Sequence, residues 1–261
     1  MKIRDIAAAI EEFAPLGLQE SYDNAGLVVG RADTEVHKLL LAVDVTEEVI
    51  EEAVAEGCDL IVTHHPVIFH PIKRLNSASY TERCVEQAIR HGVALYAAHT
   101  NLDSAPEGMS WRVGHMLSLG AMRVLEPSAA GGGAGFGVVG ELPQAQPSRE
   151  FMRQVMDRFG VRALRHGDVV CDEVRRVAVC TGAGGSLIDE ALAAGADIYL
   201  TSDLRYNDFM RHEGRMILAD MGHFESEYCA IDILFDILSK KLPIFAIRKS
   251  VRSRNPVNYM V

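Results

Sequence analysis

Apolar and polar positions are distributed along the chain in blocks that predict short buried strands separated by helices. The runs at 38–43, 59–63 and 93–98 are short and mostly apolar, as expected of strands in the middle of a parallel sheet. Residues 3–13 instead repeat their apolar side chains at helical spacing. Strands that alternate with helices of about a dozen residues predict an α/β fold with mainly parallel central sheets.

Capping residues mark where the predicted helices begin and end. Thr46 is suited to cap a helix that carries Glu47 and Glu48 in its first turn, and Gly57 is a common residue just past a helix end. A second helix is expected near 81–90, followed by the stop signal His91-Gly92. These signals place both helices between predicted strands.

The same pattern occurs again in the second half of the chain. Residues 41–63, displaced by 138 positions, align without gaps with residues 179–201. Seven identical pairs illustrate the match: Ile50 and Ile188, Glu52 and Glu190, Ala53 and Ala191, Ala55 and Ala193, Gly57 and Gly195, Asp59 and Asp197, and Thr63 and Thr201. We interpret the chain as two related α/β halves, residues 1–127 and 128–261, with a C-terminal helix and strand that can pack back on the first half. The alternative is that all strand–helix–strand units look alike.

A glycine-rich stretch at 128–140 is expected to join the two halves. It contains GFGVVG, which formally matches the GxGxxG pattern of dinucleotide-binding loops. Such a loop must follow a strand and open a helix, whereas this one follows a glycine run and continues into Glu141-Leu-Pro143. The stretch is therefore interpreted as a linker that enters a strand.

Composition and charge narrow the class of protein. With 261 residues, 48% apolar residues and a net charge of −10, the chain is that of a globular protein without a general nucleic-acid-binding surface. Its apolar runs fall short of the roughly 18 residues that span a bilayer, and acidic residues interrupt the first helix, where a signal peptide would be apolar. The five cysteines are odd in number and form no CxxC pair, which favours reduced core thiols in a cytoplasmic protein.

Residues with metal-binding chemistry follow the ends of predicted parallel strands. His64 and His65 come directly after one strand, and Asp103 follows the next, although Asp103 also fits a helix cap. In the second half, His223 and Glu227 are four residues apart at the start of a predicted helix, so their side chains share one face. An adjacent histidine pair on irregular backbone serves two ions more easily than one. The alternative for each fragment is an ordinary solvated side chain.

Taken together, the five residues predict a dinuclear metal site in a cleft between the halves. Three imidazoles and two carboxylates are few ligands for two ions, so one carboxylate is expected to bridge, and the remaining positions are left open for water. Open positions are typical of catalytic rather than structural metal sites. Zn, Fe and Mn all accept this mixture of nitrogen and oxygen ligands.

Five motifs occur in this order along the chain: YDNAGLVVG at 22–30, THHP at 63–66, HTNLD at 99–103, GFGVVGEL at 135–142 and GHFESE at 222–227. Together they resemble the NGG-interacting-factor family, many of whose bacterial members are labelled GTP cyclohydrolase 1 type 2 homologues. Tyr22 stands where the family often has Trp, and Gly108-Met-Ser110 replaces a common Gly-Val-Asn. The spacing is that of the short form, which lacks an inserted domain between the halves.

The resemblance implies a ligand assignment, a reaction and an assembly. His64 and His223 would hold one divalent ion, His65 and Asp103 the other, and Glu227 both. The reaction implied is hydrolysis of GTP to dihydroneopterin triphosphate with release of formate, and the assembly is a homohexamer. His99 is a further candidate, either as an outer ligand or as a proton shuttle.

A glycine-rich turn in the second half is the candidate anion site. Gly182, Gly184, Gly185 and Ser186 join a predicted strand to a helix, and backbone N–H groups at such a helix start can hold a phosphate. A tight turn with Ser186 as the helix cap explains the same residues almost as well.

Two functions are compatible with these observations. One is a metal-dependent hydrolase that acts on a nucleotide or a similar phosphorylated compound. The other is a non-enzymatic metal-binding adaptor or metal-handling protein. Open metal positions favour the enzyme, and the lack of an obvious separate general acid favours the adaptor.

Overall fold

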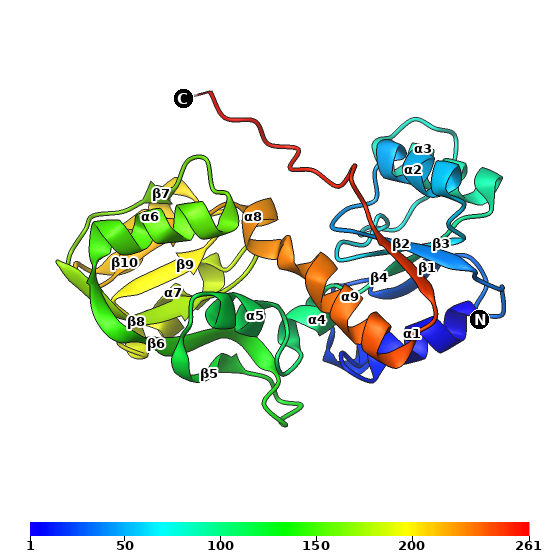
Figure 1. Ribbon diagram of the computed structural model, residues 1–261. Helices are drawn as coiled ribbons and strands as arrows, with labels where there is room; N and C mark the ends of the chain where they lie inside the picture. The colour runs from blue at the N-terminus through cyan, green and yellow to red at the C-terminus, as the bar shows by residue number, and fades with distance from the viewer. Residues whose placement is uncertain (261) are drawn as a thin grey trace. The chain divides into compact units, whose positions relative to one another are not determined.

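A computed structural model describes residues 1–260 of the chain. The chain forms two compact units (Figure 1). The first unit contains Met1–Ala105 and Ala230–Arg254, and the second contains Pro106–Cys229 and the chain end from Asn255. The predicted α/β class is confirmed in both units, each of which has its own sheet.

The first unit is a five-stranded sheet with helices on both faces. Its elements are α1 (Ile3–Glu11), η1 (Leu16–Leu18), β1 (Gly26–Val29), β2 (Lys38–Ala42), α2 (Glu47–Glu56), β3 (Leu60–Thr63), α3 (Tyr80–His91), β4 (Ala94–Ala97), α4 (Thr100–Ser104), α9 (Cys229–Lys241) and β11 (Ala246–Lys249). The strand order is β1-β4-β3-β2-β11, with all neighbours parallel except β1 and β4. Figure 1 shows α2 and α3 on one face and α1 and α9 on the other.

Local sequence explains these elements well. Thr46 accepts a hydrogen bond from the Val49 N–H at 3.1 Å and caps α2, as predicted. Gly57 ends the same helix at a φ of 67°, a left-handed conformation that favours glycine. The apolar faces of α2 and α3 then pack on alternate side chains of the strands, which include Leu40 and Ile61.

The second unit is a six-stranded mixed sheet. Its elements are α5 (Met109–Met116), β5 (Gly120–Pro127), β6 (Gly135–Pro147), α6 (Ser148–Phe159), β7 (Arg165–His166), β8 (Glu173–Val179), η2 (Gly185–Leu187), α7 (Ile188–Ala193), β9 (Ile198–Thr201), η3 (Tyr206–His212), β10 (Ile217–Asp220) and α8 (His223–Glu227). The order is β5-β6-β8-β9-β10-β7, and only β8, β9 and β10 run parallel to one another. The parallel core is thus smaller than in the first unit.

The internal repeat corresponds to a strand–helix–strand segment in each unit. Residues 41–63 span the end of β2, α2 and β3, and residues 179–201 span the end of β8, α7 and β9. Gly57 and Gly195 both adopt a φ of 67° after their helices. The helices differ, because α7 has six residues and is preceded by the 3₁₀ turn η2, whereas α2 has ten residues.

The boundary between the units lies elsewhere than the sequence suggests. The units divide between Ala105 and Pro106, not between residues 127 and 128. The glycine-rich stretch is the loop of an antiparallel hairpin, in which β5 pairs with β6 and Pro127 lies opposite Gly135. The glycines belong to the connecting loop 128–134 within one sheet, and Gly131, Gly132 and Gly133 all have positive φ. GFGVVG enters a strand, as expected, and opens no helix.

Within residues 1–260, no helix combines the length and the apolar character needed to cross a bilayer.

The C-terminal α9 and β11 belong to the first unit, where β11 pairs in parallel with β2. The chain therefore returns to its first sheet after completing the second.

Candidate metal centre

His64 and His65 lie immediately beyond the C-terminal end of β3. The His64 side chain is fully buried, and its Nδ1–H donates to the Ala98 carbonyl oxygen at 2.8 Å. A carbonyl oxygen only accepts, so this bond fixes the tautomer in which Nε2 carries the lone pair. The His65 Nδ1 lies 2.7 Å from the carboxylate of Asp44, which anchors that ring in the same way. Both rings are therefore oriented by a contact at Nδ1, which leaves Nε2 as the nitrogen that could coordinate a metal ion.

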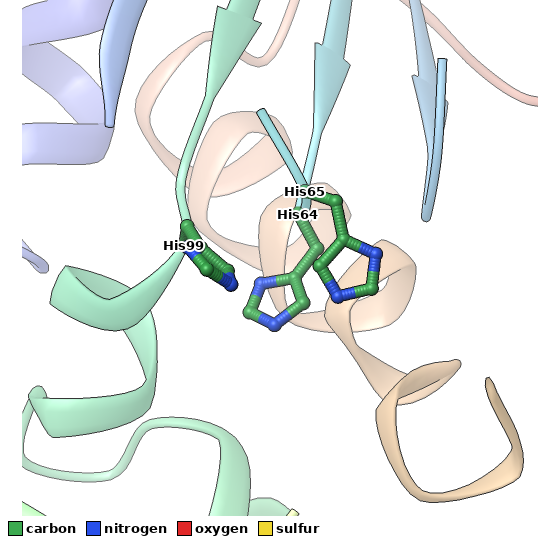
Figure 2. A group of neighbouring side chains, drawn as sticks. All are labelled: His64, His65 and His99. Atoms are coloured by element: carbon green, nitrogen blue, oxygen red, sulfur yellow. The ribbon is translucent and has the colours of Figure 1, made fainter. Parts of the chain in front are cut away.

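His99 joins the two from the end of the neighbouring strand β4. Figure 2 shows the three imidazoles grouped beyond the strand ends. The ring centroid of His99 is 5.2 Å from that of His64 and 5.4 Å from that of His65. One nitrogen from each ring can be chosen so that all three lie within 4.8 Å of one another, a spacing compatible with a metal ion. The structure thus brings three histidines together within the first unit.

Asp23 orients His99 from the segment before β1. Its Oδ1 lies 2.7 Å from His99 Nδ1, and its Oδ2 accepts from the Thr100 N–H and hydroxyl at 3.1 and 2.5 Å. Burial raises the pKa of this carboxyl, but the hydrogen bonds from His99 and Thr100 outweigh that effect and lower the pKa to about 2. Asp23 is therefore a carboxylate throughout the physiological range, and it holds His99 with Nδ1 engaged.

Asp103 lies on the short helix α4, directly after His99. One carboxylate oxygen is 3.7 Å from His64 Nε2. Asp103 sits inside α4 (Thr100–Ser104), so the alternative that it caps a following helix is wrong. The contact places Asp103 beside His64, whereas the family resemblance implied that it shares an ion with His65.

His223 and Glu227 form the corresponding group in the second unit. Both lie on α8, where His223 Nε2 is 2.9 Å from a carboxylate oxygen of Glu227, as the four-residue spacing predicts. His223 Nδ1 is 2.8 Å from Asp203. Burial lowers the pKa of His223, but its hydrogen bonds to Asp203 and Glu227 outweigh that effect and raise the pKa to about 11. This strongly anionic surrounding is the electrostatic environment that a divalent cation requires.

Asp220, at the end of β10, ties together the two loops that carry this pair. Its carboxylate accepts from the backbone N–H groups of Leu204 and Gly222, each at 3.1 Å. Leu204 follows Asp203, and Gly222 precedes His223. Arg165 pairs with the same carboxylate at 3.0 Å and also donates to the Leu204 carbonyl oxygen. Asp220 and Arg165 therefore position Asp203 and His223 relative to each other.

Gly182, the first residue of the candidate anion site, lies against Glu227. A Cβ at Gly182 would overlap a carboxylate oxygen of Glu227, and its φ of 65° also disfavours other residues. The Gly182 N–H donates to Ser226 Oγ and the Gly184 N–H to Thr201 Oγ1, both at 3.0 Å. Two N–H groups of this turn thus have internal acceptors. Its binding of a phosphate stays a prediction, which these contacts weaken.

Ser186 does not cap the helix that follows the turn. The structure gives Leu187 as the N-cap of α7, without a side-chain hydrogen bond, and Gly185 and Ser186 lie in the 3₁₀ turn η2. The alternative explanation of the turn therefore fails at this residue. The glycines are explained instead by close packing around Gly182 and Gly184.

Three carboxylates that orient the histidines are not among the site residues predicted from the sequence. Asp44 directly follows the predicted strand at 38–43, and Asp203 lies two residues beyond the repeated segment 179–201, so their places near strand ends were an available signal. Asp23 lies in the YDNAG segment, 76 positions from its partner His99. No periodicity connects residues that far apart, so the fold alone reveals the pair.

Several known proteins resemble this chain over most of its length. A family model described as Duf34/NIF3 (NGG1p interacting factor 3) matches residues 1–256. A Clostridium perfringens protein named GTP cyclohydrolase 1 type 2 homolog is 34% identical over 87% of both chains, and a Streptomyces coelicolor protein of the same name is 35% identical over 87% of this chain and 82% of its own. The crystal structure of a Bacillus cereus protein related to NIF3 matches 100% of this chain and 99% of that chain with a TM-score of 0.90 at 22% identity, a likeness of fold.

Proposed function

The chain belongs to the Duf34/NIF3 family, and from that premise we propose that it is a metal-dependent hydrolase of GTP or a related nucleotide. His64, His65 and Asp103 of the first unit and His223 and Glu227 of the second would hold two divalent ions. This assignment joins side chains that each unit already presents at the end of parallel strands.

The residues fit such a pair of ions in their chemistry. Imidazole and carboxylate ligands suit Zn, Fe and Mn. Because Asp103 lies beside His64, we assign these two to one ion, His65 and His223 to the other, and Glu227 to both. Five ligands leave coordination positions open on two ions, as catalytic sites do.

The observation that carries the proposal is that all four histidines of the candidate metal centre are held at Nδ1. A backbone carbonyl holds His64, and carboxylates hold His65, His99 and His223. Metal-binding histidines almost always donate their second N–H to such a partner, which fixes the ring and strengthens the ligand. Ordinary surface histidines do not need a fixed partner at Nδ1. The presence of such a partner on four neighbouring imidazoles therefore supports their assignment to a metal site.

Each group then has a defined task in hydrolysis. When bound, two divalent ions would supply hydroxide at neutral pH, because they lower the pKa of a coordinated water to about 7. Asp23 holds His99 with Nε2 directed toward the histidine group, where it can accept or return a proton during ring opening. Asp44 and Asp203 keep His65 and His223 in place. The net reaction proposed is hydrolysis of GTP to formate and dihydroneopterin triphosphate.

A substrate panel tests the activity. Metal-loaded protein is incubated with GTP, other nucleotides and simple phosphoesters, and the products are separated by chromatography. Formate release from GTP that disappears in the His65→Ala variant supports the proposal. Turnover of none of these compounds by protein with a full metal content would favour the adaptor or metal-handling function instead.

The metal content has its own test. Elemental analysis of protein purified without chelator should give about two divalent ions per chain, as a bridged pair requires. A reproducible value of one or less contradicts the dinuclear site whatever the activity.

We further propose a homohexamer in the cytoplasm, as the family resemblance implies. All five cysteines are thiols, which fits a reducing compartment. Light scattering at several concentrations tests the assembly, and a monomer at every concentration would contradict it.

A further inference from the structure

A groove of about 770 Å³ lies in the first unit beside the histidine group. It is formed by the segment between β3 and α3 and by the first turn of α3. Its walls combine an aromatic ring, Phe69, with the cationic side chains of Lys73 and Arg74. No part of the proposed metal site uses these residues.

The charge of the groove is opposite to that of the whole chain. Lys73 and Arg74 face one carboxylate, Glu82, although the chain carries a net charge of −10. Within residues 1–260, neither cation forms an ion pair. Ser79 and Thr81 also line the groove at the N-terminus of the twelve-residue helix α3, whose dipole favours an anion. An anion bound in the groove would be stabilised by the two cationic side chains, the two hydroxyl groups and the helix dipole.

The acidic residue of the groove is already engaged. One carboxylate oxygen of Glu82 accepts from the N–H groups of Asn76 and Ala78 at 3.1 and 3.0 Å, and Ser79 Oγ accepts from the Glu82 N–H at 3.3 Å. These bonds fold the segment before α3 onto the helix start. Glu82 therefore serves to shape the groove, and its charge is partly offset by backbone dipoles.

Phe69 connects the groove to the metal-binding histidines. Its ring centroid is 6.0 Å from that of His99 and 6.3 Å from that of Tyr22, both at steep angles. Phe69 is 39% exposed and Tyr22 is 64% exposed, which is high for aromatic side chains. A planar ring placed on Phe69 would thus lie between the cations of the groove and the histidine group.

We propose that this groove binds the phosphate of a nucleotide substrate, with Lys73 and Arg74 on the phosphate and Phe69 against the base. The inference rests on the proposed function in one respect, which is that the base then extends toward the site of hydrolysis. The groove, and not the Gly182–Ser186 turn, is the anion site of the protein.

Calorimetric titration of the protein as purified tests the proposal, with GMP and guanosine as probes. The Lys73→Gln/Arg74→Gln variant should bind GMP at least about tenfold more weakly, because two charge-assisted contacts are lost. Its affinity for guanosine should change less than about twofold, since guanosine has no phosphate. Phe69→Leu should weaken both probes severalfold through lost stacking.

A matched control, Arg31→Gln/Arg90→Gln, removes two positive charges elsewhere in the first unit. Arg31 follows β1, and Arg90 lies in the last turn of α3. Both therefore lie near the start of β4, at the strand ends opposite to the groove. This variant should bind GMP like the wild type. A loss as large as that of the Lys73/Arg74 variant would mean that net charge, not the groove, determines binding, and would overturn the proposal.

The outcomes separate this inference from the hydrolase proposal. If GMP binding depends on Lys73 and Arg74 while GTP is not hydrolysed, the groove stands and the hydrolase fails. If GTP is hydrolysed, but its KM and the GMP affinity are unchanged in the Lys73→Gln/Arg74→Gln variant, the groove is excluded and the hydrolase stands. Absence of GMP binding to the wild type at millimolar concentration also excludes the groove.

Discussion

The strand-end edges of the two units show how one repeated scaffold can carry different chemistry. In the displacement of 138 positions that relates the repeats, Asp44 aligns with Gly182 and His65 with Asp203. In the first unit the two aligned positions form the Asp44–His65 pair themselves. In the second unit Asp203 pairs instead with His223, after the next strand. The pair of the first unit follows β2 and β3, whereas the pair of the second unit follows β9 and β10. Since β9 corresponds to β3 in the repeat, the second pair lies one strand later.

Gly182 explains why the second unit cannot copy the first. A side chain at this position would occupy the volume of the Glu227 carboxylate. An aspartate there, as at position 44, would also place two negative charges against each other. The two repeats therefore share their strands, their helix and the glycine that follows the helix. The residues beyond the strand ends differ, because each must fit the side chains that pack beside it.

The largest expected effect concerns Glu227, which has no equivalent in the first unit. If it bridges both ions, Glu227→Gln should lower the metal content from about two ions per chain to less than one. His64→Ala should remove one ion and leave the other. Elemental analysis of both variants, purified in parallel without chelator, makes the comparison. Equal losses would show that Glu227 is an ordinary ligand of a single ion.

Gly182→Ala tests the packing argument. Both the left-handed φ and the overlap with Glu227 act against alanine, so the free energy of unfolding should fall by about 1–3 kcal/mol and metal should be lost. Gly57→Ala is the control, because Gly57 has nearly the same φ with open space around it. That variant should lose about 1 kcal/mol and retain its metal. Urea unfolding with metal analysis distinguishes them, and full metal retention in Gly182→Ala would refute the packing argument.

The two orienting carboxylates provide a more graded comparison. Asp44→Asn and Asp203→Asn should each weaken metal binding about 10–100-fold, because loss of a histidine's partner typically costs that much. Competition with a fluorescent chelator measures the affinities. Asp189→Asn, an exposed position on α7, is the control. If only one of the two variants weakens binding, the units do not contribute equivalent ligands.

The sequence predicts what local pattern determines. The strands, the caps at Thr46 and Gly57, and the His223–Glu227 contact all depend on neighbours within a few residues. The Asp23–His99 pair and the unit boundary depend on long-range pairing, so no local signal defined them. Glycines 131–133 could serve a linker or a hairpin equally well, and only the register of β5 with β6 decides.

The smallest expected effect compares the starts of the two repeated helices. Thr46 Oγ1 accepts from the Val49 N–H and satisfies one of the free N–H groups at the start of α2, so Thr46→Ala should cost about 1 kcal/mol. Ser186 lies at a similar place before α7 but provides no cap, and Ser186→Ala should change the free energy of unfolding by less than about 0.5 kcal/mol. Urea denaturation curves at equal metal content measure both. A cost for Ser186→Ala as large as for Thr46→Ala would mean that the shorter helix is capped like the longer one, and that the two repeats differ less at their helix starts than at their strand ends.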